Sequence, residues 1–404
     1  MRKKAPREAP AAMVASTEGS RFLRWLPGAL LLCVLAAGLA LTVIDPATFT
    51  APKNAKLVNG EWSAGWQESY EQGLPGREAA VAAWAAMRYA LSAEGEPVVL
   101  VGRDGWLYST EEFFPLDPTG RALEAALANI AVVRDALAAR NIALVVALVP
   151  TKAVVCAEHL GRYRLPASLR DRYGAVRRAI SSLGVAVPDL MAPLREAASR
   201  GEVFLRTDTH WTADGASVAA QALAQVVRPE LDARGSPRTR YRTEKGKPQE
   251  RRGDLLNFLP LGRLGGAWEP ASDLVADAAT VADADSGAGL FGALEIPVAL
   301  VGTSYSAAGA SNFDGALKEA LRADVLKVAE EGRGPFVPMR KYLESPAIDD
   351  PRPDVVIWEI PERYLGVSTP LGVSTPLGVS TPLGVSTPLG MPVGMPAPPE
   401  PSAR

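Results

Sequence analysis

The feature that most constrains the fold is the alternation of continuous apolar runs with helix-like segments from about residue 96 to residue 365. Three runs stand out: "IALVVALVP" at 142–150, "EIPVALVGTSYS" at 295–306 and "PDVVIWEIPERYL" at 353–365. Strands that are buried on both faces of a parallel sheet have this character. Because helical segments separate the runs, we expect an α/β fold in which helices cover both faces of a mostly parallel sheet.

The spacing of apolar residues predicts the remaining elements. Residues 121–139 place leucine, isoleucine and valine at helical spacing, which indicates an amphipathic helix. The region 228–294 is rich in Pro, Arg and Asp and is expected to form loops or an insertion. Further helices are expected at 76–95, 167–183, 213–227 and near 313–330, and a β-hairpin is expected at 97–110. A short strand is expected at 184–190, and residues 202–212 are expected to be a strand that enters a loop.

The N-terminus combines a basic segment with an uncharged one. Residues 1–24 carry six basic side chains against Glu8 and Glu18, whereas residues 25–44 carry no charge. An apolar run of about 20 residues can cross a bilayer as a helix, and basic residues before it favour a cytoplasmic N-terminus. We therefore predict a cytoplasmic segment at 1–24, an uncleaved transmembrane signal anchor at 25–44 and a linker at 45–75. A cleaved signal peptide is the alternative, whereas a buried core helix is disfavoured because no polar face interrupts the run.

Charge and cysteine content argue against other classes of protein. The net charge of −2 does not indicate nucleic-acid binding. Of the two cysteines, Cys33 lies inside the predicted membrane helix and Cys156 far beyond it, so we expect neither a disulfide framework nor a zinc motif. The hexapeptide "LGVSTP" occurs four times between Leu365 and Pro388, and we expect residues 366–404 to form a disordered low-complexity tail.

The stretch "RTDTHWTADGA" contains one of the two histidines in the chain. In an extended segment, alternate side chains point to the same side, so Asp208 can hold Nδ1 of His210 and leave Nε2 free as a base. Alternatively, Asp208 or Thr209 caps the following helix and His210 packs against Trp211. A metal site would need more ligands than this pair supplies. The other histidine of the chain is His159, and no cluster of carboxylates accompanies it. We therefore expect no metal and no cofactor.

The stretch "VALVGTSYSAAGASNF" supplies a nucleophile for this base. A Gly-x-Ser turn directly after a buried strand exposes the serine hydroxyl at the carboxyl end of the strand, where ligands bind in α/β sheets. Ser304 is the residue at the turn and Ser306 is its near rival, although a serine here can also cap a helix. The backbone N–H of Tyr305 and the side chain of Asn312 are candidate oxyanion donors, although the sequence alone favours a helix cap for Asn312.

Three other side chains are considered for the same crevice. Lys152 follows the strand that ends at residue 150 and is a candidate substrate-binding residue, with a solvated surface lysine as the default interpretation. Trp211 is a second candidate contact, and it can also simply pack beside His210. His159 has no Gly-x-Ser partner of its own, so we interpret it as a structural residue rather than a competing base.

Five motifs in order carry a family resemblance: "VGRDGWLY", "LVPTKAVVCAEHLG", "TDTHWTADGA", "VGTSYS" and "VIWEIPERYL". The region 96–365 resembles the AlgJ/AlgX-type polysaccharide (alginate) O-acetyltransferases. The AlgJ type is the closer one, because no room remains for a carbohydrate-binding module. The resemblance implies an SGNH-hydrolase-like three-layer fold over 76–365 and a triad of Asp208, His210 and Ser304. The chain departs from the standard SGNH pattern, because Gly-Thr-Ser replaces Gly-Asp-Ser and Asp-x-His precedes the serine.

The resemblance also implies a location and a partner. It predicts a single-pass type II protein of the cell inner membrane whose catalytic domain lies in the periplasm. A multi-pass membrane O-acyltransferase would supply the acetyl groups. We expect an exopolysaccharide, alginate-like or cellulose-like, to accept them.

Three functions are compatible with these residues. The first is an O-acetyltransferase that acts through an acetyl-serine intermediate. The second is a carbohydrate acetylesterase with the same triad, in which water replaces the sugar hydroxyl. The third is a non-catalytic scaffold for polysaccharide modification, and the presence of all three triad residues argues against it.

Overall fold

The computed structural model describes residues 18–44, 56, 60–74, 76–261, 269–283, 296–350 and 352–367. The chain divides into two units, Met1–Trp84 and Ala85–Arg404. The first unit contains the helices α1 (Glu18–Ile44) and α2 (Glu61–Gly73), and α3 (Arg77–Ser92) begins in it. Of these helices, α2 lies inside the predicted linker, and α3 confirms the helix predicted at 76–95.

The helix α1 contains the predicted anchor segment 25–44, and its side chains from residue 25 to residue 40 are exposed. Within the part of the chain that the structure describes, no helix combines the length and the hydrophobicity needed to cross a membrane. The side chains of residues 41–44, which complete the predicted span, lie outside the described residues. On α2, aromatic residues four positions apart stack on one face: Trp62 on Trp66, and Trp66 on Tyr70.

The second unit is built on a parallel sheet of four strands, in the order β3 (Ala143–Val149), β8 (Val355–Pro361), β6 (Val298–Gly302) and β7 (Val325–Ala329). Every residue of β6 and β8 is buried. The three apolar runs therefore form β3, β6 and β8, which confirms the predicted α/β class and its parallel sheet.

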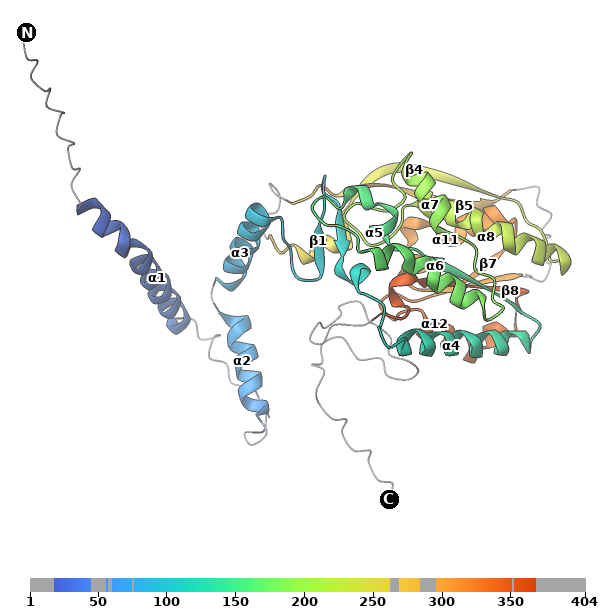
Figure 1. The fold of residues 1–404 in the computed structure, drawn as a ribbon, viewed down its shortest axis with the longest axis horizontal. Helices are drawn as coiled ribbons and strands as arrows, with labels where there is room; N and C mark the ends of the chain where they lie inside the picture. The colour runs from blue at the N-terminus through green and yellow to red at the C-terminus, as the bar shows by residue number, and fades with distance from the viewer. Residues whose placement is uncertain are drawn as a thin grey trace, which may run out of the picture. The chain divides into compact units, whose positions relative to one another are not determined.

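Alternate residues of these strands feed two hydrophobic clusters, one on each face of the sheet. The first cluster packs Val145, Ala147 and Val149 against α7 (Met191–Ala198), α8 (Ala213–Ala233) and α11 (Phe313–Leu321). The second packs Leu144, Val146 and Leu148 against α4 (Arg121–Ala138), α6 (Ala167–Ser181) and α12 (Phe336–Glu344). Figure 1 shows α8 and α11 on one side of the sheet and α4 and α12 on the other. The unit therefore has three layers.

Several predicted elements differ from the observed ones. The region 228–294 contains an antiparallel ribbon of β4 (Tyr241–Arg251) and β5 (Asp273–Ala282), where loops were expected. The strand β7 occupies part of the helix predicted near 313–330. The strands predicted at 184–190 and 202–212 reduce to single bridges, Val145 with Ala186 and Phe204 with Trp211.

The hairpin predicted at 97–110 is confirmed by β1 (Val99–Val101) and β2 (Leu107–Ser109). Two short helices follow strands of the sheet, α5 (Lys152–Val155) after β3 and α10 (Ser304–Ala307) after β6. At the end of the described chain, Val367 forms a bridge with Leu116. From residue 368 onward, the predicted tail with most of the "LGVSTP" repeats lies outside the described residues.

Candidate active site

The predicted site residues lie where the strands of the sheet end. The strand β6 ends at Gly302 and leads into α10, whose first residue is Ser304. The strand β3 leads into α5, whose first residue is Lys152. Past β8 lies the short 3-10 helix η8 (Glu362–Tyr364). Ligands of α/β sheets bind beyond the carboxyl ends of the strands, so this edge is the expected place for a site.

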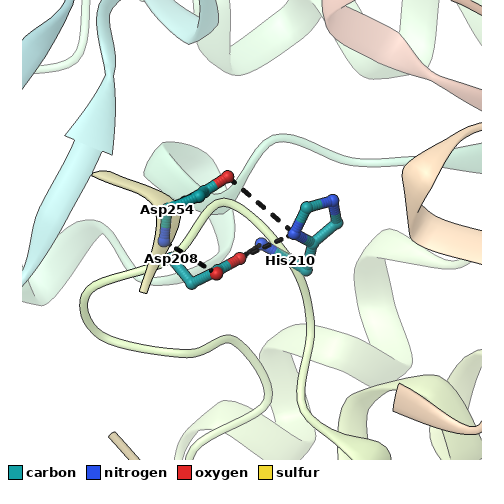
Figure 2. Close-up of side chains that lie close together, drawn as sticks. All are labelled: Asp208, His210 and Asp254. Carbon is teal, nitrogen blue, oxygen red and sulfur yellow. Dashed lines mark hydrogen bonds and ion pairs between the residues drawn. The ribbon is translucent and has the colours of Figure 1, made fainter. Parts of the chain in front are cut away.

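Asp208 and His210 form a directly bonded pair on the loop that precedes α8. Oδ1 of Asp208 lies 2.6 Å from Nδ1 of His210 and also accepts the backbone N–H of His210 at 2.9 Å. An ionised carboxylate can only accept a hydrogen bond, so this contact assigns the ring hydrogen to Nδ1 and leaves a lone pair on Nε2. Nε2 is buried and has no hydrogen-bond partner among the described residues. In Figure 2, Nε2 points away from the carboxylates.

Burial and pairing act in opposite directions on the pair. Burial on its own would raise the pKa of Asp208, but the hydrogen bonds and the charge of His210 lower that pKa to about 2. Burial would lower the pKa of His210, but Asp208 and then the charge of Asp254 raise it above its usual value. The pair therefore favours an ionised carboxylate that supports a protonated imidazole.

The turn after β6 distinguishes Ser304 from Ser306. The buried carboxylate of Glu359 on β8 accepts the N–H of Thr303 at 2.7 Å, and the hydroxyls of Thr303 and Ser306 at 3.0 Å. Ser306 is thus fully buried and its hydroxyl is bonded to Glu359, whose pKa is raised by burial. Ser304 is partly exposed, and neither its hydroxyl nor its N–H has a hydrogen-bond partner among the described residues. Of the two serines, Ser304 is therefore the one whose hydroxyl is not bonded by a described residue.

Tyr305 connects the Ser304 turn to the His210 loop. Its hydroxyl donates to the carbonyl of Thr209 at 2.8 Å, and its carbonyl accepts Nε1–H of Trp211 at 3.2 Å. Its ring meets the imidazole of His210 edge-on, with ring centroids 5.0 Å apart. The residue next to Ser304 thus contacts the residues on both sides of His210. The N–H of Tyr305 points to Oγ1 of Thr303 at 3.4 Å, which leaves the N–H of Ser304 as the free backbone donor.

The three remaining candidates have structural contacts. Lys152 is fully buried, and its ammonium group donates to the carbonyls of Leu107, Arg206 and Asp208 at 2.6, 2.9 and 2.9 Å, so the default interpretation as a surface lysine is wrong. Trp211 is buried against Tyr305. The amide of Asn312 donates to Thr280 of β5 at 2.9 Å, away from the pair. Lys152 and Trp211 are thus buried, whereas Asn312 is half-buried.

The sequence did not reveal Asp254, which is the first residue of the 3-10 helix η4 (Asp254–Phe258). Its carboxylate lies 4.0 Å from Nδ1 of His210. It belongs to the region expected to form loops, 46 positions from Asp208, and no local pattern marks it. His159, the rejected base, stacks on Trp106 with ring centroids 4.3 Å apart.

Asp208, His210 and Asp254 bring three potential metal-ligand atoms within 4.8 Å of one another. Ligands of one tetrahedral ion lie about 3 Å or more apart, because each metal bond is about 2 Å long. The 2.6 Å contact between Asp208 and His210 is shorter than that. The carboxylate of Asp254 also accepts the N–H and the hydroxyl of Thr209, at 2.8 and 2.6 Å. The arrangement therefore fits proton transfer better than metal binding.

Comparison with known proteins identifies the family. Residues 99–362 match the model of the SGNH hydrolase-like domain of the acetyltransferase AlgX. The chain is 45% identical over 328 residues to the probable alginate O-acetylase AlgJ of Pseudomonas putida, across 80% of this chain and 85% of that protein. The AlgJ protein of Pseudomonas aeruginosa is 39% identical over 333 residues, 80% of this chain and 84% of its own length.

Solved structures agree with the sequence comparison. The O-acetyltransferase domain of Pseudomonas putida AlgJ superposes with a TM-score of 0.60 at 44% identity, covering 68% of this chain and 95% of that chain. AlgX of Pseudomonas aeruginosa has a TM-score of 0.54 at 24% identity and covers 65% of this chain and 61% of its own, which supports the fold alone. This chain therefore belongs to the AlgX family of SGNH hydrolase-like acetyltransferase domains, and within it is similar to the AlgJ-type O-acetylases.

Proposed function

We propose that this protein is an O-acetyltransferase that transfers acetyl groups to hydroxyls of an exopolysaccharide through an acetyl-Ser304 intermediate. The observation that carries the proposal is the 2.6 Å contact that holds His210 with an unpartnered Nε2 beside the Ser304 turn. A histidine in this tautomer is the base that a serine nucleophile needs. The similarity to probable alginate O-acetylases supports alginate as the acceptor polymer.

In the proposed reaction, Nε2 of His210 removes the proton of Ser304 while Oγ attacks the carbonyl carbon of an acetyl donor. The N–H of Ser304 donates a hydrogen bond to the developing oxyanion. His210 then returns its proton to the leaving group, and acetyl-Ser304 remains. In the second half, His210 deprotonates a sugar hydroxyl, which attacks the acetyl-serine and regenerates Ser304. His210 becomes an imidazolium once in each half of the reaction, and Asp208 stabilises that charge.

We also propose the location and the partner that this chemistry requires. The uncharged segment 25–44 follows six basic residues, which supports a single-pass type II anchor in the inner membrane with the catalytic unit in the periplasm. The acceptor of such an enzyme is outside the cytoplasm. An acetyl supplier must then deliver its group across the membrane, and a multi-pass O-acyltransferase is the class of partner that can do so.

Substitution of Ser304 tests the proposal. The full-length protein should acetylate alginate oligosaccharides in the presence of an activated acetyl ester, and Ser304→Ala should lower the rate by about a thousandfold or more. Ser306→Ala is the matched comparison, because its hydroxyl is bonded to Glu359. Transfer that survives in Ser304→Ala and disappears in Ser306→Ala would assign the nucleophile to Ser306.

The products distinguish the proposed enzyme from its alternatives. Mass spectrometry should find acetylated oligosaccharide, together with acetyl-Ser304 when the acceptor is omitted. Free acetate as the only product, with and without oligosaccharide, would show an esterase. Polymer acetylation in cells that does not depend on Ser304 would show a scaffold.

A further inference from the structure

A second carboxylate, that of Asp254, contacts the loop that carries the Asp208–His210 pair. Asp254 begins η4, which lies between β4 and β5 in the sequence. Its backbone N–H donates to Oδ2 of Asp208 at 3.0 Å. Its side chain accepts the backbone N–H of Thr209 at 2.8 Å and the hydroxyl of Thr209 at 2.6 Å. Asp254 therefore binds two consecutive residues of the loop, immediately before His210.

These bonds determine how the Asp208 carboxylate is oriented. Oδ1 of Asp208 serves His210, and Oδ2 is held by the N–H of Asp254. With both oxygens bonded, the carboxylate cannot rotate without breaking a contact. The carbonyl of Thr209 accepts the hydroxyl of Tyr305, so the clamp on Thr209 also connects to the residue next to Ser304. Displacement of Thr209 would move His210 relative to the nucleophile.

The charge of Asp254 faces the imidazole ring as well. Its Oδ2 lies 4.0 Å from Nδ1 of His210, and Figure 2 shows both carboxylates on the Nδ1 side of the ring. Asp208 faces the ring from the same loop, Tyr305 from α10, Glu359 from β8 and Arg363 from η8. Arg363 opposes protonation of His210, whereas Asp208 and Asp254 favour it. Asp254 contacts this loop without bonding directly to the ring.

We propose that Asp254 is a positioning residue of the acetyl-transfer site, which clamps the Asp208–Thr209 segment and supplies a second negative charge to the His210 imidazolium. The proposal rests on the proposed function, in which His210 becomes protonated twice in each cycle. A misplacement of about 1 Å in a reacting group can cost about a hundredfold in rate, so a clamp on this loop affects catalysis without touching the substrate.

The first test measures His210 without relying on activity. The chain contains two histidines, so the imidazole NMR signals of the full-length protein in detergent micelles can be assigned with His159 as an internal reference. Asp254→Asn keeps the backbone N–H and an acceptor for Thr209 but removes the charge. It should move the titration of His210 to lower pH and leave that of His159 unchanged. Asp254→Glu should preserve the wild-type titration of His210.

Asp117 provides the matched control. Its carboxylate accepts the N–H of Thr119 at 3.0 Å and the hydroxyl of Thr119 at 2.6 Å, which is the same clamp on a threonine, and it has no contact with His210. Asp117→Asn should leave the His210 titration and the transfer rate unchanged. A His210 titration in Asp254→Asn that equals those of the wild type and of Asp117→Asn would overturn the proposal.

Kinetics supply the second test. Asp254→Ala should lower kcat for acetyl transfer about tenfold to a hundredfold with KM nearly unchanged, and the acid limb of the pH–rate profile of Asp254→Asn should shift to lower pH. A kcat within twofold of the wild type in Asp254→Ala would rule out the clamp. An inactive wild-type protein whose His210 titration still responds to Asp254→Asn would contradict the proposed function and leave the placement of Asp254 intact.

Discussion

Buried charged side chains hold the loop of residues 206–211 in place, since the loop itself has almost no regular structure. The ammonium group of Lys152 donates to the carbonyls of Arg206 and Asp208 at 2.9 Å. The carboxylate of Asp273 accepts the backbone N–H groups of Arg206 and Thr207 at 2.7 and 3.0 Å. Buried polar groups of a backbone need partners, and here side chains supply them instead of a sheet ladder. Arg206, Thr207 and Asp208 are therefore each held by a specific bond.

At the residue scale, the Asp208–His210 pair should make stability depend on pH. The pKa of Asp208 is lowered to about 2, so its contribution is present above its usual pKa of about 4 and is lost as the pH falls toward 2. The pKa of His210 is raised, so its contribution is present below about 6.5 and is lost as the pH rises through the raised value. The pair should therefore stabilise the fold most between about pH 4 and 6.5.

Urea unfolding of the wild type and of Asp208→Asn between pH 3 and pH 8 measures this effect. We expect the variant to be less stable by about 2 kcal/mol inside the window. The difference should narrow toward pH 3, and it should narrow on the alkaline side as the pH rises through the raised pKa of His210. A difference in unfolding free energy that stays constant across the range would show that the bond contributes through shape and not through charge.

At the element scale, the turn from β6 into α10 depends on a glycine. A Cβ atom at Gly302 would lie 2.5 Å from Oε2 of Glu359 and 2.6 Å from Oγ of Ser306. Gly302→Ala must therefore push the Glu359 carboxylate away from Thr303, which precedes Ser304. We expect a loss of about 1–3 kcal/mol in unfolding free energy, as in other overpacked cores, together with slower acetyl transfer. Gly309→Ala is the control, because a Cβ there meets nothing within 4 Å; equal melting temperatures of the two variants would contradict this account.

The elements differ in how far their sequences reveal them. The strands β3, β6 and β8 are buried and apolar along their length, so a continuous run of apolar residues marks them. The edge strand β7 has five residues with an exposed lysine in its middle. Its sequence is therefore interpreted as a continuation of the helix α11. The ribbon strand β4, "YRTEKGKPQER", is almost wholly exposed and contains a proline, so no apolar alternation signals it. Tertiary contacts determine the secondary structure of such segments.

At the scale of the whole molecule, the sequence revealed the parts of the site that depend on local contacts and missed those that depend on distant segments. The contact between Asp208 and His210 was predictable because it is local, and the placement of Ser304 at the end of β6 because a strand-to-turn motif marks it. Asp254 reaches the pair from a segment with no sequence signal, and the burial of Lys152 opposes the usual exposure of lysine. Contacts between distant segments therefore account for what the sequence did not reveal.

Contacts at the C-terminal end of the described chain predict how truncation affects the stability of the whole molecule. The side chains of Arg172 on α6 and Glu362 are fully buried and form an ion pair of 2.8 Å, and Leu365 is buried in the cluster that covers the α4 face of the sheet. A chain that ends at Pro361 would leave Arg172 buried without its partner, which costs about 3–5 kcal/mol. A chain that ends at Pro370 keeps all of these contacts. We expect the longer truncation product to melt with the full-length protein and the shorter one to melt well below it; loss of stability in the chain ending at Pro370 would mean that residues beyond it contribute to the fold.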